Sequence, residues 1–458
     1  MDKERIKFLL IRFIKYLNIT GICGIFYIAC KYYYFDQIAM PYGWRGEAAI
    51  LGVFGLLYLI YCRIYHATLI NLYSVSEIVY SQTLALLISD FMIYVVFILL
   101  SKTFPSPWPL FVAFFVQIIF SVVWAVLSMK AYYRFIHPSR MALIYKDEKD
   151  VKKISQIKME KKSMIVRKIV KPNSCKEVCD SLYDIDAVCI IGISTKIRDG
   201  IIKYCIKNDI HVYCVAKTGD IILKGARNMS FLNLPILYVH RAVPSIEYLM
   251  IKRLIDILFS SVIVILLSPL MLMVAITIKA SDGGPVLYSQ NRLTKDGKIF
   301  KIYKFRSMYM DAEADGVARL ATQNDTRITK IGRIMRRFRF DEIPQLFNII
   351  EGSMSIVGPR PERPEIAAQY EEALQYFSLR LQVKAGLTGY AQVYGKYSTE
   401  PYEKLQMDLL YITKMSLVED LRLMFATIKI LFVRESTEGI QEDQVIASKN
   451  SDTYSKAI

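Results

Sequence analysis

Four long apolar segments occupy the first third of this chain and restrict what it can fold into. They lie at approximately residues 9–30, 48–65, 79–101 and 109–129. Each is close to the ~20 residues with which an α-helix crosses the hydrocarbon core of a bilayer. The alternative is the buried core of a soluble protein, but four such segments joined by short links argue against it. We therefore predict a four-helix transmembrane domain over residues 1–135.

Basic residues at both ends of this predicted domain indicate its orientation. Those before the first segment and after the fourth are Lys3, Arg5, Lys7, Lys130, Arg134 and Arg140. Lysine and arginine are concentrated on the cytoplasmic side of membrane proteins. Since the number of spans is even, both ends of the domain are expected to face the cytoplasm.

The whole chain combines apolar residues with an excess of positive charge. It is 53% hydrophobic, and its formal net charge is +17. This combination suits a membrane protein whose polar parts face anionic lipid or a phosphate-rich substrate. No nucleic acid is expected as a partner, because the chain has neither zinc-finger spacing nor an RNA-binding signature. The eight cysteines form no CxxC pair, which is typical of free thiols in a reducing compartment.

Residues 136–245 have a different pattern, in which short apolar runs alternate with a helix-like segment. The runs DAVCIIGI (186–193) and HVYCV (211–215) flank IRDGIIKYCIKN (197–208). This order indicates a small parallel α/β domain. Its first strand, MALIYKDEKD (141–150), leads into charged residues without the glycine-rich turn that binds dinucleotides. We therefore predict a degenerate Rossmann-like domain and assign it no ligand.

A fifth apolar segment, residues 251–280, has two interpretations. It is long enough for a straight span, which would place the rest of the chain outside the cell. However, Ser268 and Pro269 lie in its middle, and a proline there removes a helix hydrogen bond and kinks the helix. Basic residues flank both ends, so a bent segment could enter the bilayer and return to the same side. Periodicity alone does not choose between the two.

An acidic pair, Asp341 and Glu342, directly follows a basic amphipathic helix predicted in ITKIGRIMRRFRF (328–340). Pro344 suits the first turn of a new helix, Asp341 its N-cap, and Gly352 its end. A helix N-terminus attracts phosphate and lowers carboxylate pKa values. The pair is thus either an N-cap with a salt-bridged neighbour or a carboxylate nucleophile for phosphorus, with Mg²⁺ bridging carboxylate and diphosphate.

Five blocks in the second half carry a family resemblance. They are KFRSM (304–308), DTRITKIGRIMRR (325–337), DEIPQLFNIIEGSMSIVGPRPE (341–362), KAGLTGYAQVYGK (384–396) and KLQMDLLYI (404–412). In this order they resemble the bacterial sugar transferase family, the polyprenyl-phosphate sugar-1-phosphate transferases with a monotopic catalytic core. The resemblance covers roughly residues 248–435, and the preceding regions resemble those of the larger members.

The resemblance implies a fold and a location. Residues 246–435 would form a mostly α-helical monotopic catalytic domain, in which residues 251–280 are a re-entrant membrane helix bent at Ser268 and Pro269. The catalytic domain would lie on the cytoplasmic side of the bacterial inner membrane, in contact with membrane lipids. Residues 436–458 would form a polar tail. The extra domains of larger members leave a homodimer open as an alternative to a monomer.

The resemblance also implies a reaction. Asp341 would attack the β-phosphate of a UDP-sugar and release UMP, and undecaprenyl phosphate would then take the sugar-phosphate from the carboxylate. Glu342 would either deprotonate the lipid phosphate or hold Mg²⁺ (or Mn²⁺) together with Asp341, and the sequence does not separate these roles. Two alternatives are a non-catalytic membrane scaffold and a glycosyltransferase that moves only the sugar and releases UDP. The sugar and the polysaccharide pathway are not specified.

Family positions further imply a set of phosphate- and nucleotide-binding residues. They are Lys304, Arg306, Arg337, Arg360, Lys396 and Asp408. Many members have arginine where this chain has Lys396, which keeps the charge but loses the bidentate fork. Without the resemblance, Arg360 could be a turn residue, Asp408 an exposed helix carboxylate, and Lys304 and Arg306 cations on a half-buried strand.

Overall fold

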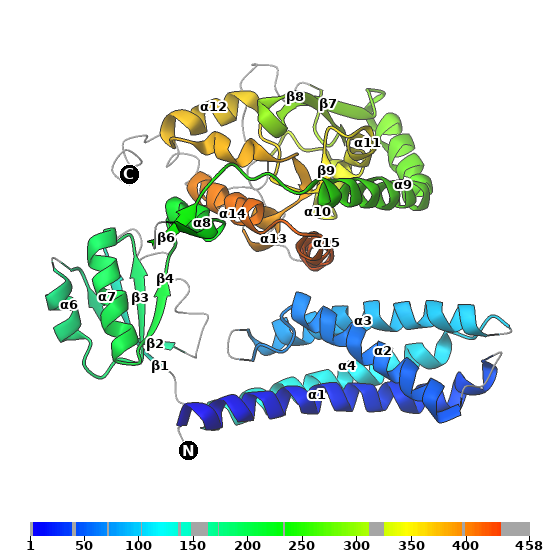
Figure 1. The fold of residues 1–458 in the computed structure, drawn as a ribbon. Coiled ribbons are helices and arrows are strands. Elements are labelled where there is room, and N and C mark those ends of the chain that lie inside the picture. The colour runs from blue at the N-terminus through cyan, green and yellow to red at the C-terminus, as the bar shows by residue number, and fades with distance from the viewer. Residues whose placement is uncertain are drawn as a thin grey trace. The chain divides into compact units, whose positions relative to one another are not determined.

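The computed structural model describes most of the chain, in two compact units. The described residues are 3–38, 43–70, 73–101, 103–135, 139–147, 164–172, 174–231, 234–310, 325–395 and 399–431. The units are Met1–Val215 and Ala216–Ile458. Figure 1 shows the elements of both.

Long apolar helices form the N-terminal part of the first unit. They are α1 (Lys3–Tyr33), α2 (Gly43–Ile64), α3 (Val75–Leu100) and α4 (Trp108–Phe135), with a short 3₁₀ helix η1 (Phe35–Gln37) after α1. Each packs against two of the others, because α1 contacts α2 and α4 while α3 also contacts α2 and α4. All are long and apolar enough to cross a membrane, so the apolar segments are confirmed as helices.

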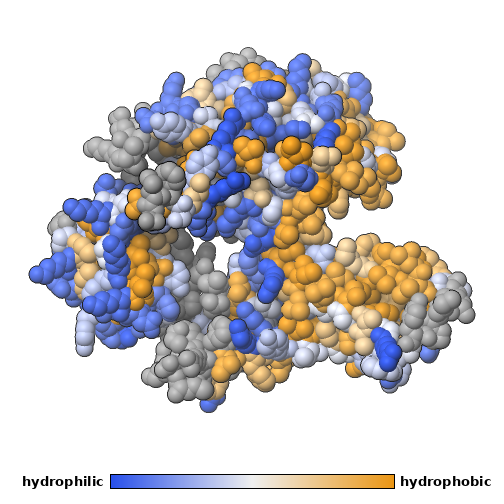
Figure 2. Space-filling view, in the orientation of Figure 1, coloured by the Kyte–Doolittle hydropathy of each residue, from blue (hydrophilic) through white to orange (hydrophobic). Residues whose placement is uncertain are grey.

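Aromatic and small polar residues fill the interior of this bundle, whereas apolar side chains cover its outside. Phe26 stacks on Phe54 with ring centroids 3.8 Å apart, and Tyr34 stacks on Phe97 at 4.7 Å. Figure 2 shows the mainly hydrophobic outer surface of the helices. Such a surface suits contact with lipid chains.

The α/β region forms the rest of the first unit. Its elements are β1 (Ser139–Tyr145), β2 (Met164–Val170), α6 (Cys175–Ser181), β3 (Ala187–Ile191), α7 (Thr195–Lys207) and β4 (His211–Cys214). The strands are parallel in the order β2-β1-β3-β4. Ala142 and Val188 of the sheet and Ile201 of α7 belong to its core. The predicted strand–helix–strand order and parallel sheet are confirmed.

The second unit begins at Ala216. The side chain of Ile221 packs into the core of this unit. The predicted limits of the α/β domain, residues 136–245, stay a prediction. The unit starts with α8 (Thr218–Lys224), the hairpin β5 (Arg227–Phe231) and β6 (Leu234–Tyr238), and the long helix α9 (Ile246–Asp282).

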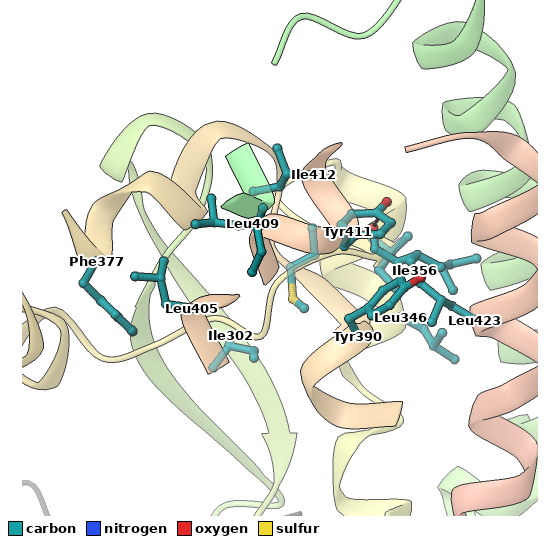
Figure 3. Close-up of a cluster of buried hydrophobic side chains, with 14 residues drawn as sticks. Ile302, Leu346, Ile356, Phe377, Tyr390, Leu405, Leu409, Tyr411, Ile412 and Leu423 are labelled. Carbon is teal, nitrogen blue, oxygen red and sulfur yellow. Dashed lines mark hydrogen bonds between the residues drawn. The ribbon is translucent and has the colours of Figure 1, made fainter. Parts of the chain in front are cut away.

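The remaining elements of the second unit are short. They are β7 (Leu287–Leu293), η2 (Lys295–Gly297), β8 (Ile299–Phe305), α10 (Lys330–Arg337), η3 (Phe340–Glu342), α11 (Gln345–Glu351), β9 (Ser355–Val357), α12 (Pro364–Ala373), η4 (Phe377–Gln382), β10 (Gly386–Thr388), α13 (Tyr390–Tyr394), α14 (Pro401–Lys414) and α15 (Leu417–Leu431). Strands β7 and β8 pair antiparallel, and β9 and β10 pair parallel. Figure 3 shows the core that joins them, with Leu346 of α11, Leu409 of α14 and Leu423 of α15.

Helix α9 changes direction along its length, as its ribbon shows in Figure 1. Pro269 lies inside it and leaves the carbonyl of Ile265 without the usual amide donor. The hydroxyl of Ser268 donates to that carbonyl at 2.8 Å instead. The sequence left open whether this segment is straight or bent, and in the structure it is bent.

The two halves of α9 contact opposite ends of the segment that contains α11. In the first half, Arg253 donates to the carbonyls of Ile349 and Ile350 at the end of α11, at 2.5 and 2.6 Å. In the second half, Ile278 packs with Phe305, in a cluster that Ile343 also contacts. A straight helix would separate residues 253 and 278 by about 37 Å, at ~1.5 Å per residue. The bend allows both halves to reach the two ends of α11.

Most of the outer surface of α9 is exposed and apolar. Leu258, Ile265, Leu266 and Leu272 are 55–70% exposed, and Figure 2 shows this surface as hydrophobic. The helix is also long and apolar enough to cross a membrane. It is therefore suited to lie within lipid.

Candidate active site

The acidic pair lies in the 3₁₀ turn η3, directly before α11. Arg339 precedes the turn in the left-handed conformation, with φ of 55°. Pro344, and not Asp341, occupies the N-cap position of α11. The predicted N-cap role of Asp341 is therefore wrong, because the extra turn of 3₁₀ helix moves it away from the end of α11. Gly352 ends α11 with φ of 99°, as predicted.

Glu342 is surrounded by cations. Its Oε1 accepts hydrogen bonds from Lys304 Nζ at 2.9 Å and Arg360 Nη2 at 2.8 Å. Arg339 Nη1 lies 3.7 Å from its Oε2. Burial alone would raise the pKa of Glu342, but Arg360, Lys304 and Arg339 together hold it well below the usual value. Glu342 is thus held in its ionised form by these cations.

Asp341 has a different environment, although it is equally buried at 8% exposure. Within the described ranges, the carboxylate oxygens of Asp341 accept no hydrogen bond and form no ion pair. The carboxylate is open in the sense that no neighbouring protein group occupies its oxygens. Burial raises its pKa, against the opposing positive charge of Lys304, and the neighbouring charge of Glu342 raises it further. The expectation that a helix N-terminus and arginines would lower the pKa of both carboxylates thus fails for Asp341.

Arg360 is presented to Glu342 by a loop, Gly358–Glu362, that is held along its whole backbone. The carbonyls of residues 359 to 362 accept hydrogen bonds from Gly386 N, Arg380 Nη2, Arg292 Nη1 and Leu293 N at 2.8–3.1 Å. The amide of Gly358 donates to Thr388 O at 2.8 Å. Pro359 and Pro361 have no amide to satisfy. The loop therefore holds Arg360 in one place without depending on solvent.

Asp408 lies behind this loop. It is fully buried on α14 and pairs with Arg380, whose Nε and Nη2 lie 2.8 and 2.7 Å from its Oδ2. Arg380 Nη2 in turn donates to the carbonyl of Arg360 at 2.8 Å. Burial raises the pKa of Asp408 to about 6 despite this ion pair. Asp408 is therefore not an exposed helix carboxylate. It positions Arg380 and, through it, Arg360, and its place in a phosphate site stays a prediction.

Two further predicted residues are cations beside regular elements: Arg306 directly follows β8, and Arg337 ends α10. Arg306 packs against Gly284, where an added side chain would collide with its guanidinium. Arg337 is exposed, with its guanidinium 5.8 Å from the centre of the Phe338 ring. Lys396 lies outside the described residues. Ser268 and Pro269 lie in α9, as described above.

Three arginines near the acidic pair and its supporting loop were not among the residues predicted from the sequence. Arg336 faces the charge of Asp341, Arg339 pairs with Glu342, and Arg380 holds the loop of Arg360. Arg336 and Arg339 lie within five residues of Asp341 along the chain, so this closeness in sequence was a usable signal. Nothing local to Arg380 indicated its role, because its partners are distant in sequence.

The described residues offer few ligands for a divalent metal. No group of three or more His, Cys, Asp or Glu residues suited to a metal occurs among them. Both oxygens of Glu342 already face cations, whereas Asp341 is open. Mg²⁺ usually binds one or two carboxylates together with substrate phosphates. These residues therefore fit a metal that is held by Asp341 and by phosphate oxygens of the substrate. They fit a metal held by both Asp341 and Glu342 less well.

Comparison with known proteins identifies this region. The family model for bacterial sugar transferases matches residues 247–434. The chain is 40% identical over 192 residues to an *Aeromonas hydrophila* UDP-N-acetylgalactosamine-undecaprenyl-phosphate N-acetylgalactosaminephosphotransferase, covering 41% of the chain and 45% of that protein. It is 43% identical over 190 residues to a *Klebsiella pneumoniae* UDP-glucose:undecaprenyl-phosphate glucose-1-phosphate transferase, covering 40% and 41%. The matches thus span less than half the length of either relative.

A shorter relative is matched almost completely. The chain is 40% identical over 200 residues to the exopolysaccharide production protein PSS of *Rhizobium leguminosarum* bv. phaseoli, covering 42% of the chain and 98% of that protein. The residues that the family model matches, 247–434, include the acidic pair, the loop Gly358–Glu362 and Asp408. On this basis the protein belongs to the bacterial sugar transferase family.

Proposed function

We propose that the protein transfers a sugar-1-phosphate from a UDP-sugar to undecaprenyl phosphate, releasing UMP and forming undecaprenyl-diphosphate-sugar. This would be the first membrane step in making an exopolysaccharide, capsule, O-antigen or other glycan. The names of the *Aeromonas* and *Klebsiella* relatives support the reaction class. The observation that carries the proposal is the open carboxylate of buried Asp341 beside the cations gathered around Glu342.

In the first step, a carboxylate oxygen of Asp341 attacks the β-phosphorus of the UDP-sugar. A bond forms between that oxygen and phosphorus, and the bond to the oxygen bridging the two phosphates breaks. UMP leaves with the electron pair, and the sugar-phosphate remains on Asp341. In the second step, a phosphate oxygen of undecaprenyl phosphate attacks the same phosphorus and restores the carboxylate. Carboxylates are established nucleophiles for such transfers.

The surrounding residues supply charge and position, which phosphoryl transfer chiefly requires. Lys304 and Arg360 lie where they can neutralise phosphate oxygens near Asp341. Glu342 holds both cations and, because its pKa is depressed, is a poor general base. This favours a positioning role for Glu342 over deprotonation of the lipid phosphate. Mg²⁺ or Mn²⁺, when bound by Asp341 and the diphosphate, would neutralise further charge.

Helix α9 supports the proposed membrane setting. Its exposed apolar surface and its bend support a re-entrant helix that leaves the catalytic unit on the cytoplasmic side of the bacterial inner membrane, where UDP-sugars are available. Exposed Ile334 of α10 and Phe338, which directly follows α10, stand beside cationic Arg337, an arrangement suited to an anionic lipid surface. A homodimer stays a prediction.

Nucleotide release tests the proposal. Purified protein, undecaprenyl phosphate and Mg²⁺ are mixed with UDP-sugars one at a time, and UMP and UDP are measured. UMP from one sugar supports phosphosugar transfer and identifies the donor. UDP in place of UMP would contradict the mechanism and indicate a glycosyltransferase. Neither product with any UDP-sugar would favour the scaffold.

A further inference from the structure

The interior of the N-terminal helices contains a carboxyl group that the proposed reaction does not use. Asp90 of α3 is 7% exposed, and neither of its carboxyl oxygens has a hydrogen-bond partner within the described residues. Among those residues no lysine, arginine or histidine forms an ion pair with it. An ionisable residue inside a membrane domain is rare and usually functional.

Asp90 lies near the middle of its helix and of the membrane that the helix would cross. Ten residues separate it from Leu100 at the end of α3, which corresponds to about 15 Å at ~1.5 Å per residue. Gln117 lies nine residues after Trp108 at the start of the neighbouring antiparallel α4, or about 14 Å. Both side chains are therefore at one level, roughly halfway through a ~30 Å hydrocarbon core.

The groups facing Asp90 are neutral. Gln117 of α4 is fully buried, and its side chain interacts with that of Asp90, although its amide atoms have no regular hydrogen bond in the described structure. From α1, the thiol of Cys30 lies near the carboxyl group. Neither the amide nor a thiol with an ordinary pKa carries a charge at neutral pH.

We propose that Asp90 carries a proton at neutral pH and that Asp90 and Gln117 together form a proton-binding site inside the four-helix domain. The hydroxyl of the protonated carboxyl donates to Gln117 Oε1, and the amide of Gln117 donates to the carbonyl oxygen of Asp90. This arrangement gives both side chains partners without an unpaired charge in an apolar interior. Release of the proton would leave one unpaired negative charge between α3 and α4. Proton binding is therefore coupled to the packing of these two helices.

Infrared spectroscopy of the full chain in lipid nanodiscs tests this directly, because the C=O stretch of a protonated carboxyl is separate from that of a carboxylate. The spectrum of Asp90→Asn is subtracted from that of the unmodified protein at neutral pH. We expect the difference to contain a protonated-carboxyl band. The matched control Asp36→Asn, at an exposed position in η1, should remove only carboxylate bands. Other carboxyls cancel in the subtraction.

A difference for Asp90→Asn that contains only carboxylate bands would overturn the proposal and would indicate an ionised Asp90 with a bound cation. The variant Gln117→Leu provides a second test, which can be read even if Asp90→Asn does not fold. The proposal predicts that the same band persists but shifts, because the carboxyl loses its acceptor. An unshifted band would exclude Gln117 from the site, and an absent band would exclude the resident proton.

Discussion

Arg380 donates a hydrogen bond of 2.8 Å from its guanidinium to the main-chain carbonyl of Arg360, although the two residues lie on different elements. Through this bond the buried pair of Arg380 and Asp408 is connected to the guanidinium that contacts Glu342. The charge beside the acidic pair thus depends on residues that do not touch it.

Replacing Arg380 should reduce activity because the loop that carries Arg360 would lose part of its support. Arg380→Lys keeps the positive charge next to Asp408 but cannot make all the hydrogen bonds of the planar fork. We expect the loop of Arg360 to shift and kcat/KM to fall about 10- to 100-fold, since ~1 Å misplacement can cost ~10²-fold. Steady-state UMP release measures this. The control Arg333→Lys, at an exposed position on α10, should leave kcat/KM unchanged. Equal rates in both variants would show that Arg380 has no positioning role.

Asp341→Asn should remove turnover while leaving the protein folded and in the membrane. The amide has the same shape but is not a nucleophile for phosphorus, so a loss of at least ~10³-fold is expected if the carboxylate attacks. Intact-protein mass spectrometry after exposure to the UDP-sugar, without lipid acceptor, should find a phosphosugar adduct on the unmodified protein only. Glu351→Gln, at the exposed end of α11, is the matched control. Substantial UMP release by Asp341→Asn would remove Asp341 from the nucleophile role.

The dependence of kcat/KM on pH should change when Lys304 is replaced. Burial raises the pKa of Asp341, and Lys304 is the strongest opposing influence. Attack requires the ionised carboxylate, so kcat/KM should fall as the pH drops through this raised pKa. Lys304→Met removes the opposing charge and should move that acid limb to higher pH, in addition to lowering the overall rate. The measurement is kcat/KM for UMP release against pH, which reports on the free enzyme. Lys301→Met, at an exposed position on the same strand, should not move the limb.

The bend in α9 should depend on Pro269. Pro269→Ala restores the amide that the helix lacks at this point, so part of the population should straighten and cross the membrane. A reporter cysteine at exposed Lys298 (Lys298→Cys), in a background without the natural cysteines, detects this by impermeant labelling of intact cells. Labelling from outside should occur only with Pro269→Ala. If the reporter stays wholly cytoplasmic, the contacts of Arg253 and Ile278 with the catalytic unit maintain the bend by themselves.

Local features of the sequence were enough to predict the apolar helices, the parallel α/β region, the acidic pair and the end of α11 at Gly352. Each of these features depends on residues that are close together in the sequence, so their composition and spacing determine it directly. The family blocks identified the second unit because they occur together and in order.

Charge contacts between distant residues required the tertiary structure. Arg337 was predicted at the site from its position in the family block 325–337. In the structure Arg336 and Arg339 face the carboxylates. The reason is that α10 ends at Arg337 and Arg339 then adopts a left-handed conformation. The pairing of Arg380 with Asp408 joins residues 28 positions apart. The difference between Asp341 and Glu342 has the same origin: the sequence determines that two carboxylates are adjacent, but only the folded chain decides which of them the cations contact. Electrostatic energies depend on distance and burial, and neither is set by adjacency along the chain.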